Sequence, residues 1–103
     1  MTKKYKALIL DEAAQYIQTM SDADQGATNA DIDAMENGEF EAVSTKQLRG
    51  KVRELIVGSH RITYFLLGSF IYFVHGFKKK SAKTPVREIN YAEQLLEIVK
   101  KQK

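Results

Sequence analysis

The sequence lacks cysteine and tryptophan and holds a single proline, Pro85. Without cysteine there is no disulfide framework and no thiolate chemistry, and with only two histidines we expect neither a metal site nor a cofactor. No apolar run is long enough to cross a bilayer, because the longest candidate, residues 62–74, is interrupted by Gly68 and Ser69. The basic N-terminus is not followed by the apolar segment of a signal peptide. We therefore expect one domain over residues 1–103, located in the cytoplasm and without membrane contact.

Charge is abundant but unevenly distributed. Residues 7–45 contain nine acidic residues and no lysine or arginine, whereas residues 46–103 contain thirteen basic residues and four acidic ones. This division favours a protein with one surface for a polyanion and another that repels it. Alternatively, the acidic segment simply pairs with the basic half. The net charge of +3 does not distinguish the two interpretations.

Hydrophobic spacing predicts an α+β fold. We expect a strand over residues 4–10, then a hairpin of two helices, the second capped by Ser21 and ending near Asn37. After a connecting segment at 40–46, three strands are predicted over 51–57, 61–67 and 70–77. Thr84 is the expected N-cap of a final helix that begins at Pro85. The prediction is a small antiparallel sheet of about four strands, with the helices on one face and the other face free.

The most informative segment follows the last predicted strand. From Lys78 to Arg87 there are five basic residues and no acidic one. Unpaired charges are costly to bury, so this cluster faces either water or an anion such as phosphate. On the predicted strand 61–67, Arg61 lies on the side opposite the expected core residues Ile62, Tyr64 and Leu66; it either joins the lysines or pairs with Glu54.

The two histidines and the aromatic residues also allow two interpretations. His75 and Phe77 are expected to share a side of their strand with Ile71 and Phe73. His75 is either a proton carrier or a hydrogen-bonded, half-buried residue. His60 falls in a turn, where solvation is expected.

Four segments together resemble a known family. They are Arg53-Glu54-Leu55, His60-Arg61-Ile62-Thr63-Tyr64-Phe65, His75-Gly76-Phe77-Lys78-Lys79-Lys80, and Lys83-Thr84-Pro85 followed by Glu88-Ile89 and Ala92. The pattern resembles the HigB branch of the RelE/ParE toxin superfamily, which includes phage-derived host-inhibition proteins. The resemblance covers nearly the whole chain and is carried by residues 47–92. It implies a RelE-like fold.

The resemblance also implies a function. RelE-like members are toxins of type II toxin–antitoxin systems, which act as ribosome-dependent mRNA endonucleases and thereby block translation. They enter the ribosomal A site, next to rRNA, cut the codon there and use no metal. The expected partners are mRNA on the ribosome and an antitoxin with a helix-turn-helix domain, and the free toxin is expected to be a monomer.

By motif, the family's strand arginine corresponds to Arg61, and its basic cluster corresponds to Lys78, Lys79 and Lys80. The candidate catalytic residues are Arg61, Lys79, Lys80 and His75; the candidate RNA-binding residues are Lys78, Lys83, Arg53, Phe77 and Tyr91. Guanidinium groups bind phosphate oxygens bidentately but do not act as bases. The proton carrier is therefore expected among the crowded lysines or at His75, and Phe77 or Tyr91 would stack on a base.

One position departs from the family pattern. Family members commonly read Glu-Leu-Arg in the first strand of the meander, where this chain reads Glu54-Leu55-Ile56. Arg53 is adjacent, but in a regular strand it points to the other face. The loss of a cation keeps two alternatives open: a ParE-like gyrase inhibitor that cuts no RNA, and an inactive phage-derived basic module that binds RNA or protein.

Overall fold

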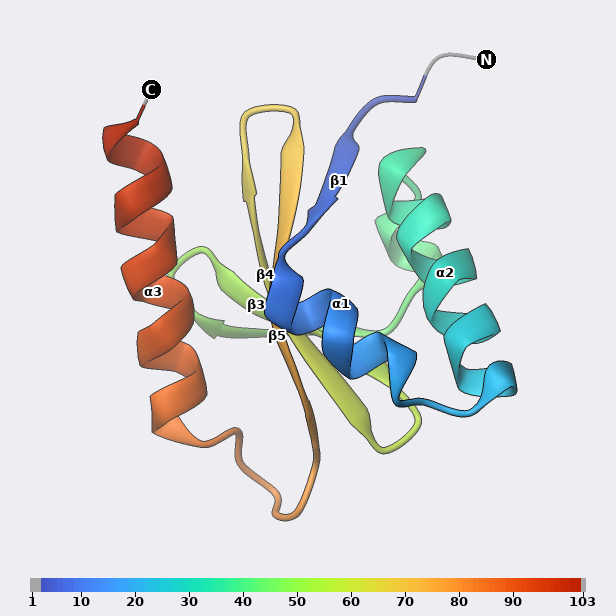
Figure 1. The fold of residues 1–103 in the computed structure, drawn as a ribbon. Helices are drawn as coiled ribbons and strands as arrows, with labels where there is room; N and C mark the ends of the chain where they lie inside the picture. Colours follow the sequence, from blue (N-terminus) through green and yellow to red (C-terminus); the bar gives the residue numbers. More distant parts are fainter. Residues whose placement is uncertain (1–2, 103) are drawn as a thin grey trace.

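The computed structural model describes residues 3–102 and has a central sheet of five strands, in the order β1-β5-β4-β3-β2, with helices on both faces (Figure 1). This is the predicted α+β class. Along the chain the elements are β1 (Lys6–Ile9), α1 (Asp11–Gln18), α2 (Asp22–Glu36), the short 3₁₀ helix η1 (Phe40–Ala42), β2 (Thr45–Arg49), β3 (Val52–Val57), β4 (His60–Leu67), β5 (Phe70–Lys78) and α3 (Val86–Lys101).

The sheet differs from the prediction in two respects. Thr45–Arg49 is not part of a connecting segment but forms the edge strand β2, antiparallel to β3. Its side chains are mostly polar and exposed, so it has no apolar alternation to reveal it. In addition, β1 pairs with β5 in parallel, which makes the sheet mixed rather than antiparallel.

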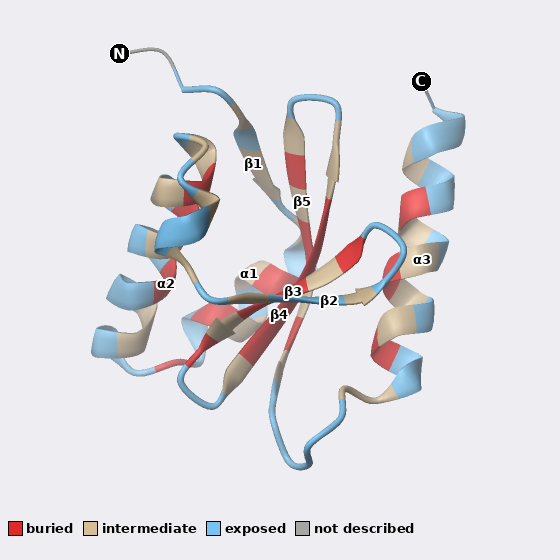
Figure 2. Ribbon diagram, turned by 180° about the vertical axis from the view of Figure 1, so that it is seen from behind, coloured by how far each residue is buried: buried red, intermediate tan, exposed pale blue. Residues whose placement is uncertain are grey.

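Both faces of the sheet are covered, so the expectation of a free face was wrong. Helices α1 and α2 pack on one face, with a core that includes Leu55, Ile62 and Phe73. Helix α3 packs on the other face against Phe65 and Val74 (Figure 2). The reason lies in β3, β4 and β5, whose buried residues point to both faces, as is usual for the central strands of a covered sheet.

A β-bulge in β5 reverses the predicted direction of its last side chains. Tyr64 pairs with Phe73 and Thr63 pairs with His75, so Val74 is an extra residue in the ladder. One extra residue moves the following side chains to the other face. His75 and Phe77 therefore share a side with Arg61, not with Phe73 as expected.

The predicted N-cap of α2 is confirmed, whereas the predicted N-cap of α3 was wrong. The Ser21 hydroxyl accepts a hydrogen bond from the Asp24 N–H at 3.2 Å and caps α2 as predicted. Pro85, rather than Thr84, is the N-cap of α3. The Thr84 hydroxyl instead donates to the Glu54 carboxylate at 2.7 Å, which ties the start of α3 to β3.

Candidate functional site

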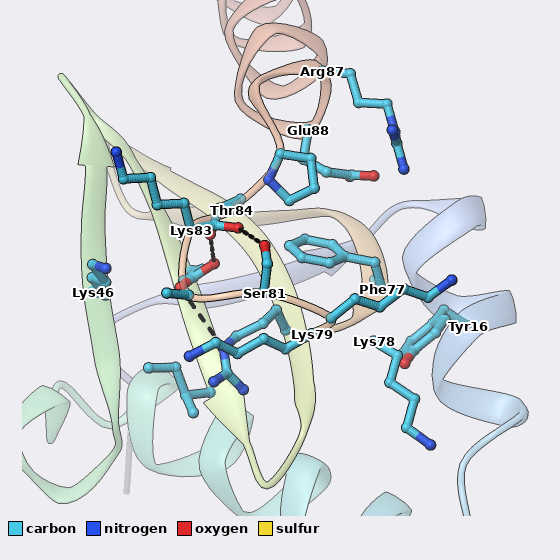
Figure 3. Close-up of a pocket in the computed structure, with 17 residues that line it drawn as sticks. Tyr16, Lys46, Phe77, Lys78, Lys79, Ser81, Lys83, Thr84, Arg87 and Glu88 are labelled. Atoms are coloured by element: carbon cyan, nitrogen blue, oxygen red, sulfur yellow. Dashed lines mark hydrogen bonds and ion pairs between the residues drawn. The ribbon is translucent and has the colours of Figure 1, made fainter.

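A cavity of about 430 Å³ lies where the chain leaves β5 and turns toward α3. Its walls come from α1, the strands β2, β3 and β4, the end of β5, the segment 79–85 and the first turn of α3. Figure 3 shows Lys46 and Lys83 on one side of it, Lys78 and Tyr16 on the other, and Lys79 between them. The lining includes the cationic residues Lys46, Arg61, Lys78, Lys79, Lys80, Lys83 and Arg87 and two carboxylates, Glu54 and Glu88.

The lysines of this cavity are exposed and have no carboxylate partner. Among the residues that the structure describes, no ion pair involves Lys46, Lys78, Lys79, Lys80, Lys83 or Arg87. The acidic residues of α1 and α2 therefore do not neutralise the basic segment, and of the two interpretations of the charge pattern the self-paired one fails here. An unpaired cluster of this size provides a strongly positive potential for an anion.

Arg61 is different, because it is buried and held by the protein. Its Nη1 donates to the carbonyl oxygens of Gly58 and His60 at 2.8 and 2.9 Å. Its Nε lies 3.8 Å from Oε2 of Glu54, and the two side chains are 9% and 4% exposed. The expected alternative, an ion pair with Glu54, is thus present but not at hydrogen-bond distance. Arg61 lines the cavity with a fixed guanidinium group.

His75 opens on a neighbouring pocket rather than on the main cavity. This second pocket, of about 290 Å³, is lined by Glu12, His75, Arg87, Glu88 and Tyr91. The His75 Nδ1 lies 2.6 Å from Oε1 of the buried Glu88, which lines both pockets. The Tyr91 hydroxyl donates to Glu12; this bond, with some burial, raises the pKa of Tyr91. His75 is hydrogen-bonded and half-buried, and its ring meets that of Tyr91 edge to face.

The structure brings most of the predicted site residues together. Arg61, Lys78, Lys79, Lys80, Lys83 and Phe77 line one cavity, and His75 and Tyr91 line the pocket beside it. Arg53 does not belong to either. It points to the α1–α2 face, as the strand alternation predicts, and donates to the Tyr64 hydroxyl at 3.3 Å and to Thr45 at 3.2 Å.

Sequence analysis missed four residues with contacts at the site. Glu54 was considered only as an ion-pair partner, although an acidic residue between Val52 and Ile56 on one face of a strand is a signal in itself. Lys46 arrives on the unrecognised strand β2. Tyr16 and His60 form a hydrogen bond of 2.7 Å, so His60 is not merely solvated as expected; no sequence signal could have indicated a contact between residues so far apart.

Comparisons with known proteins are consistent with this architecture. The chain covers 99% of a chain in the crystal structure of the archaeal RelE–RelB complex from Pyrococcus horikoshii OT3, with a TM-score of 0.60 over 77% of this chain and 17% sequence identity. At that identity the match shows a similar, RelE-like fold. Residues 15–97 match the family described as phage-derived protein Gp49-like (DUF891), and the chain belongs to this family. No curated protein sequence matches it.

Two further observations concern ions and membranes. Within residues 3–102, no group of three or more histidine and acidic side chains is arranged to hold a metal ion. In the same part of the chain, no helix has both the length and the apolar character needed to span a membrane.

Proposed function

We propose that this protein is a toxin of a type II toxin–antitoxin pair, of the RelE type and the HigB branch, and that it cuts mRNA on the ribosome. The observation that carries the proposal is the convergence of the fixed Arg61 guanidinium and five unpaired lysines on one cavity. Support comes also from the Gp49-like family and from the likeness of fold to a chain of a RelE–RelB complex.

The chemistry of RNA cleavage suits these groups. The 2′-hydroxyl attacks the adjacent phosphate in line, which requires orientation, removal of the 2′ proton and stabilisation of the extra negative charge. Arg61 offers Nη2, which has no hydrogen-bond partner among residues 3–102, to a phosphate oxygen while Nη1 is held by two carbonyls. Lys79, Lys80 and Lys83 supply further charge around the same phosphate.

Proton transfer has three kinds of candidate carrier: a lysine, Glu54 and His75. A neutral amine of Lys79 or Lys80 can take the 2′ proton, as the sequence suggested, and so can the Glu54 carboxylate, which is oriented by the Thr84 hydroxyl. His75, backed by Glu88, is the candidate that would protonate the leaving 5′ oxygen from the neighbouring pocket. Substitution of Glu54 by glutamine separates the first two, because the amide keeps an acceptor for Thr84 but no longer accepts a proton.

The proposed partners, RNA and an antitoxin, would bind the same cationic surface. Segments of rRNA and mRNA would meet the exposed lysines, and a helix-turn-helix antitoxin would cover the cationic cavity and neutralise the toxin. The free toxin is proposed to be a monomer that acts in the cytoplasm and needs no metal.

Induced expression in a bacterial host tests the function directly. The parent chain is expected to arrest growth and to produce new 5′ ends within translated messages, whereas Arg61→Ala and Lys79→Ala abolish both. The matched control is Lys101→Ala, which removes an exposed lysine on the last turn of α3, outside the cavity. If Arg61→Ala and Lys79→Ala arrest growth as strongly as the parent, the site assignment is wrong.

A second candidate function is supported by Ile56. This side chain lines the cavity at the position where family members commonly carry an arginine, so the cavity has one cation fewer and an apolar wall instead. A gyrase inhibitor without nuclease activity would give DNA-damage signalling with intact mRNA in the same experiment. A basic binding module without catalysis would give RNA binding with a steep salt dependence and no cleavage product.

A further inference from the structure

Three side chains from three different elements form a hydrogen-bonded chain beside the cavity. The Tyr16 hydroxyl on α1 lies 2.7 Å from Nδ1 of His60, and Nε2 of His60 lies 3.1 Å from the Asp24 carboxylate on α2. Burial raises the pKa of Tyr16, which favours its protonated hydroxyl. When this hydroxyl donates to Nδ1, the Nε2–H of His60 donates to Asp24, and both ring nitrogens are satisfied. The His60 side chain is 14% exposed.

The backbone of the same turn holds two of the cavity's cations. The carbonyl groups of His60 and Gly58 accept the two hydrogen bonds from Nη1 of Arg61. The carbonyl group of Ser59, between them, accepts from the backbone N–H of Lys79 at 2.8 Å. The position of this turn, residues 58–60, therefore sets the position of the Arg61 guanidinium and of the first residue after β5.

Tyr16 is itself fixed against the sheet. A Cβ atom built at Gly76 would overlap the Tyr16 ring, so the ring lies directly on the backbone of β5. Its edge also faces the His60 ring, at 5.6 Å between centroids and an interplanar angle of 71°. The Tyr16 phenol is thus held rigidly, and its hydrogen bond to His60 can fix the position of that side chain and of the turn.

We propose that Tyr16, His60 and Asp24 are positioning residues, which hold the turn 58–60 so that Arg61 and Lys79 meet one phosphate. The inference rests on the proposed function in that the phosphate is taken to belong to RNA. This series of hydrogen bonds connects the acidic helices α1 and α2 to the turn that holds the cationic cavity. Tyr16 also lines the cavity, but the positioning role requires none of the three residues to touch the substrate.

The test uses the full chain and a Tyr16→Phe variant, which removes one hydroxyl and keeps the ring on Gly76. Amide hydrogen exchange of Lys79, followed by NMR without RNA, is expected to accelerate by about 2- to 10-fold, the range for the loss of one hydrogen bond. Exchange at Ile71, in the core of β5, stays unchanged. The affinity for a single-stranded RNA oligonucleotide with uncuttable 2′-O-methyl groups is expected to fall by about the same factor.

A double-mutant cycle separates positioning from general destabilisation. In an Arg61→Ala background, Tyr16→Phe is expected to lose most of its effect on RNA affinity, because its route to the phosphate passes largely through Arg61. Asp24→Asn, which keeps an acceptor for Nε2–H, should stay near the parent, whereas Asp24→Ala should resemble Tyr16→Phe. The matched control is Tyr72→Phe. The Tyr72 hydroxyl has no hydrogen-bond partner among residues 3–102, and the Tyr72 ring stacks on Phe65.

The outcomes distinguish the two proposals. If Tyr16→Phe matches Tyr72→Phe in both the exchange of Lys79 and the RNA affinity, or weakens RNA binding equally with and without Arg61, the positioning role is overturned. The proposed function is judged separately, by the new 5′ ends in translated messages after expression. If the parent protein does not bind the free oligonucleotide, the exchange of Lys79 alone decides whether the three residues hold the turn.

Discussion

Removal of the Arg61 side chain provides a sharp test of how the cavity is built. The Arg61→Ala variant leaves the Glu54 carboxylate, 4% exposed, with the Thr84 hydroxyl as its remaining polar partner, and it leaves the carbonyl groups of Gly58 and His60 without their donor. A carboxylate buried in this way has lost its ion-pair partner, and the remaining cations of the cavity are exposed and make no ion pair with it. We expect the variant to be folded but distinctly less stable.

The expected magnitude can be worked out from these contacts. Removing one partner of a buried ion pair costs about 3–5 kcal/mol. Here the lower end applies, because Nε and Oε2 are 3.8 Å apart and Glu54 keeps its bond to Thr84. We therefore expect the free energy of unfolding to fall by about 3 kcal/mol, a large part of the stability of a small domain. Adding Glu54→Gln removes the unpaired charge and should restore about 1–2 kcal/mol.

Urea unfolding followed by circular dichroism measures both changes. For a domain of this size, a loss of about 3 kcal/mol lowers the midpoint by roughly 2–3 M urea. RNA affinity should stay low in the Glu54→Gln/Arg61→Ala double variant, although its stability partly returns. A midpoint for Arg61→Ala close to that of the parent would refute the reasoning, as would a double variant no more stable than Arg61→Ala alone.

Two further predictions concern stability. Gly76→Ala should lower the free energy of unfolding by about 1–3 kcal/mol in thermal or urea denaturation, because the added methyl group overlaps the phenol ring from α1; Gly26→Ala, where a Cβ meets nothing within 4 Å, should be neutral or slightly stabilising. The hydrogen bond from Lys3 at 2.7 Å, together with one from a backbone N–H, lowers the pKa of Glu36 from its ordinary value of 4.5. Its stabilisation is therefore complete above that value and is lost as the pH falls through the lower folded-state pKa. Unfolding titrations between pH 6 and pH 3 should show this loss of stability in the parent and a shallower loss in Glu36→Gln. Equal slopes of the free energy of unfolding against pH would contradict this argument. A Gly76→Ala variant as stable as Gly26→Ala would contradict the argument about Gly76.

Local signals in the sequence were enough for most of the elements and for the cationic cluster. The Gly68-Ser69 turn forms the predicted hairpin with glycine first at φ 62°, and Ser21 caps α2. The unpaired lysines after β5 follow from the cost of burying charge. Each of these features depends on residues close together in the chain.

The features that could not be predicted depend on long-range pairing. The bulge at Val74 places Phe77 and His75 on the same side as Arg61, and no residue type in this segment indicates a bulge. Thr84 reads as a helix cap until the Glu54 carboxylate is placed beside it. Register and tertiary partners override local preference at such positions, and the candidate site is where most of them gather.

The parallel pairing of β1 with β5 has a consequence for folding during synthesis. Lys6 pairs with Phe70, 64 residues later, so the first strand has no place in the sheet until β5 has left the ribosome. Such distant pairing is associated with slow folding. The last residues that line the cavity, Arg87 and Glu88, emerge later still, so a nascent chain acquires the cavity only after the first turn of α3 has left the ribosome.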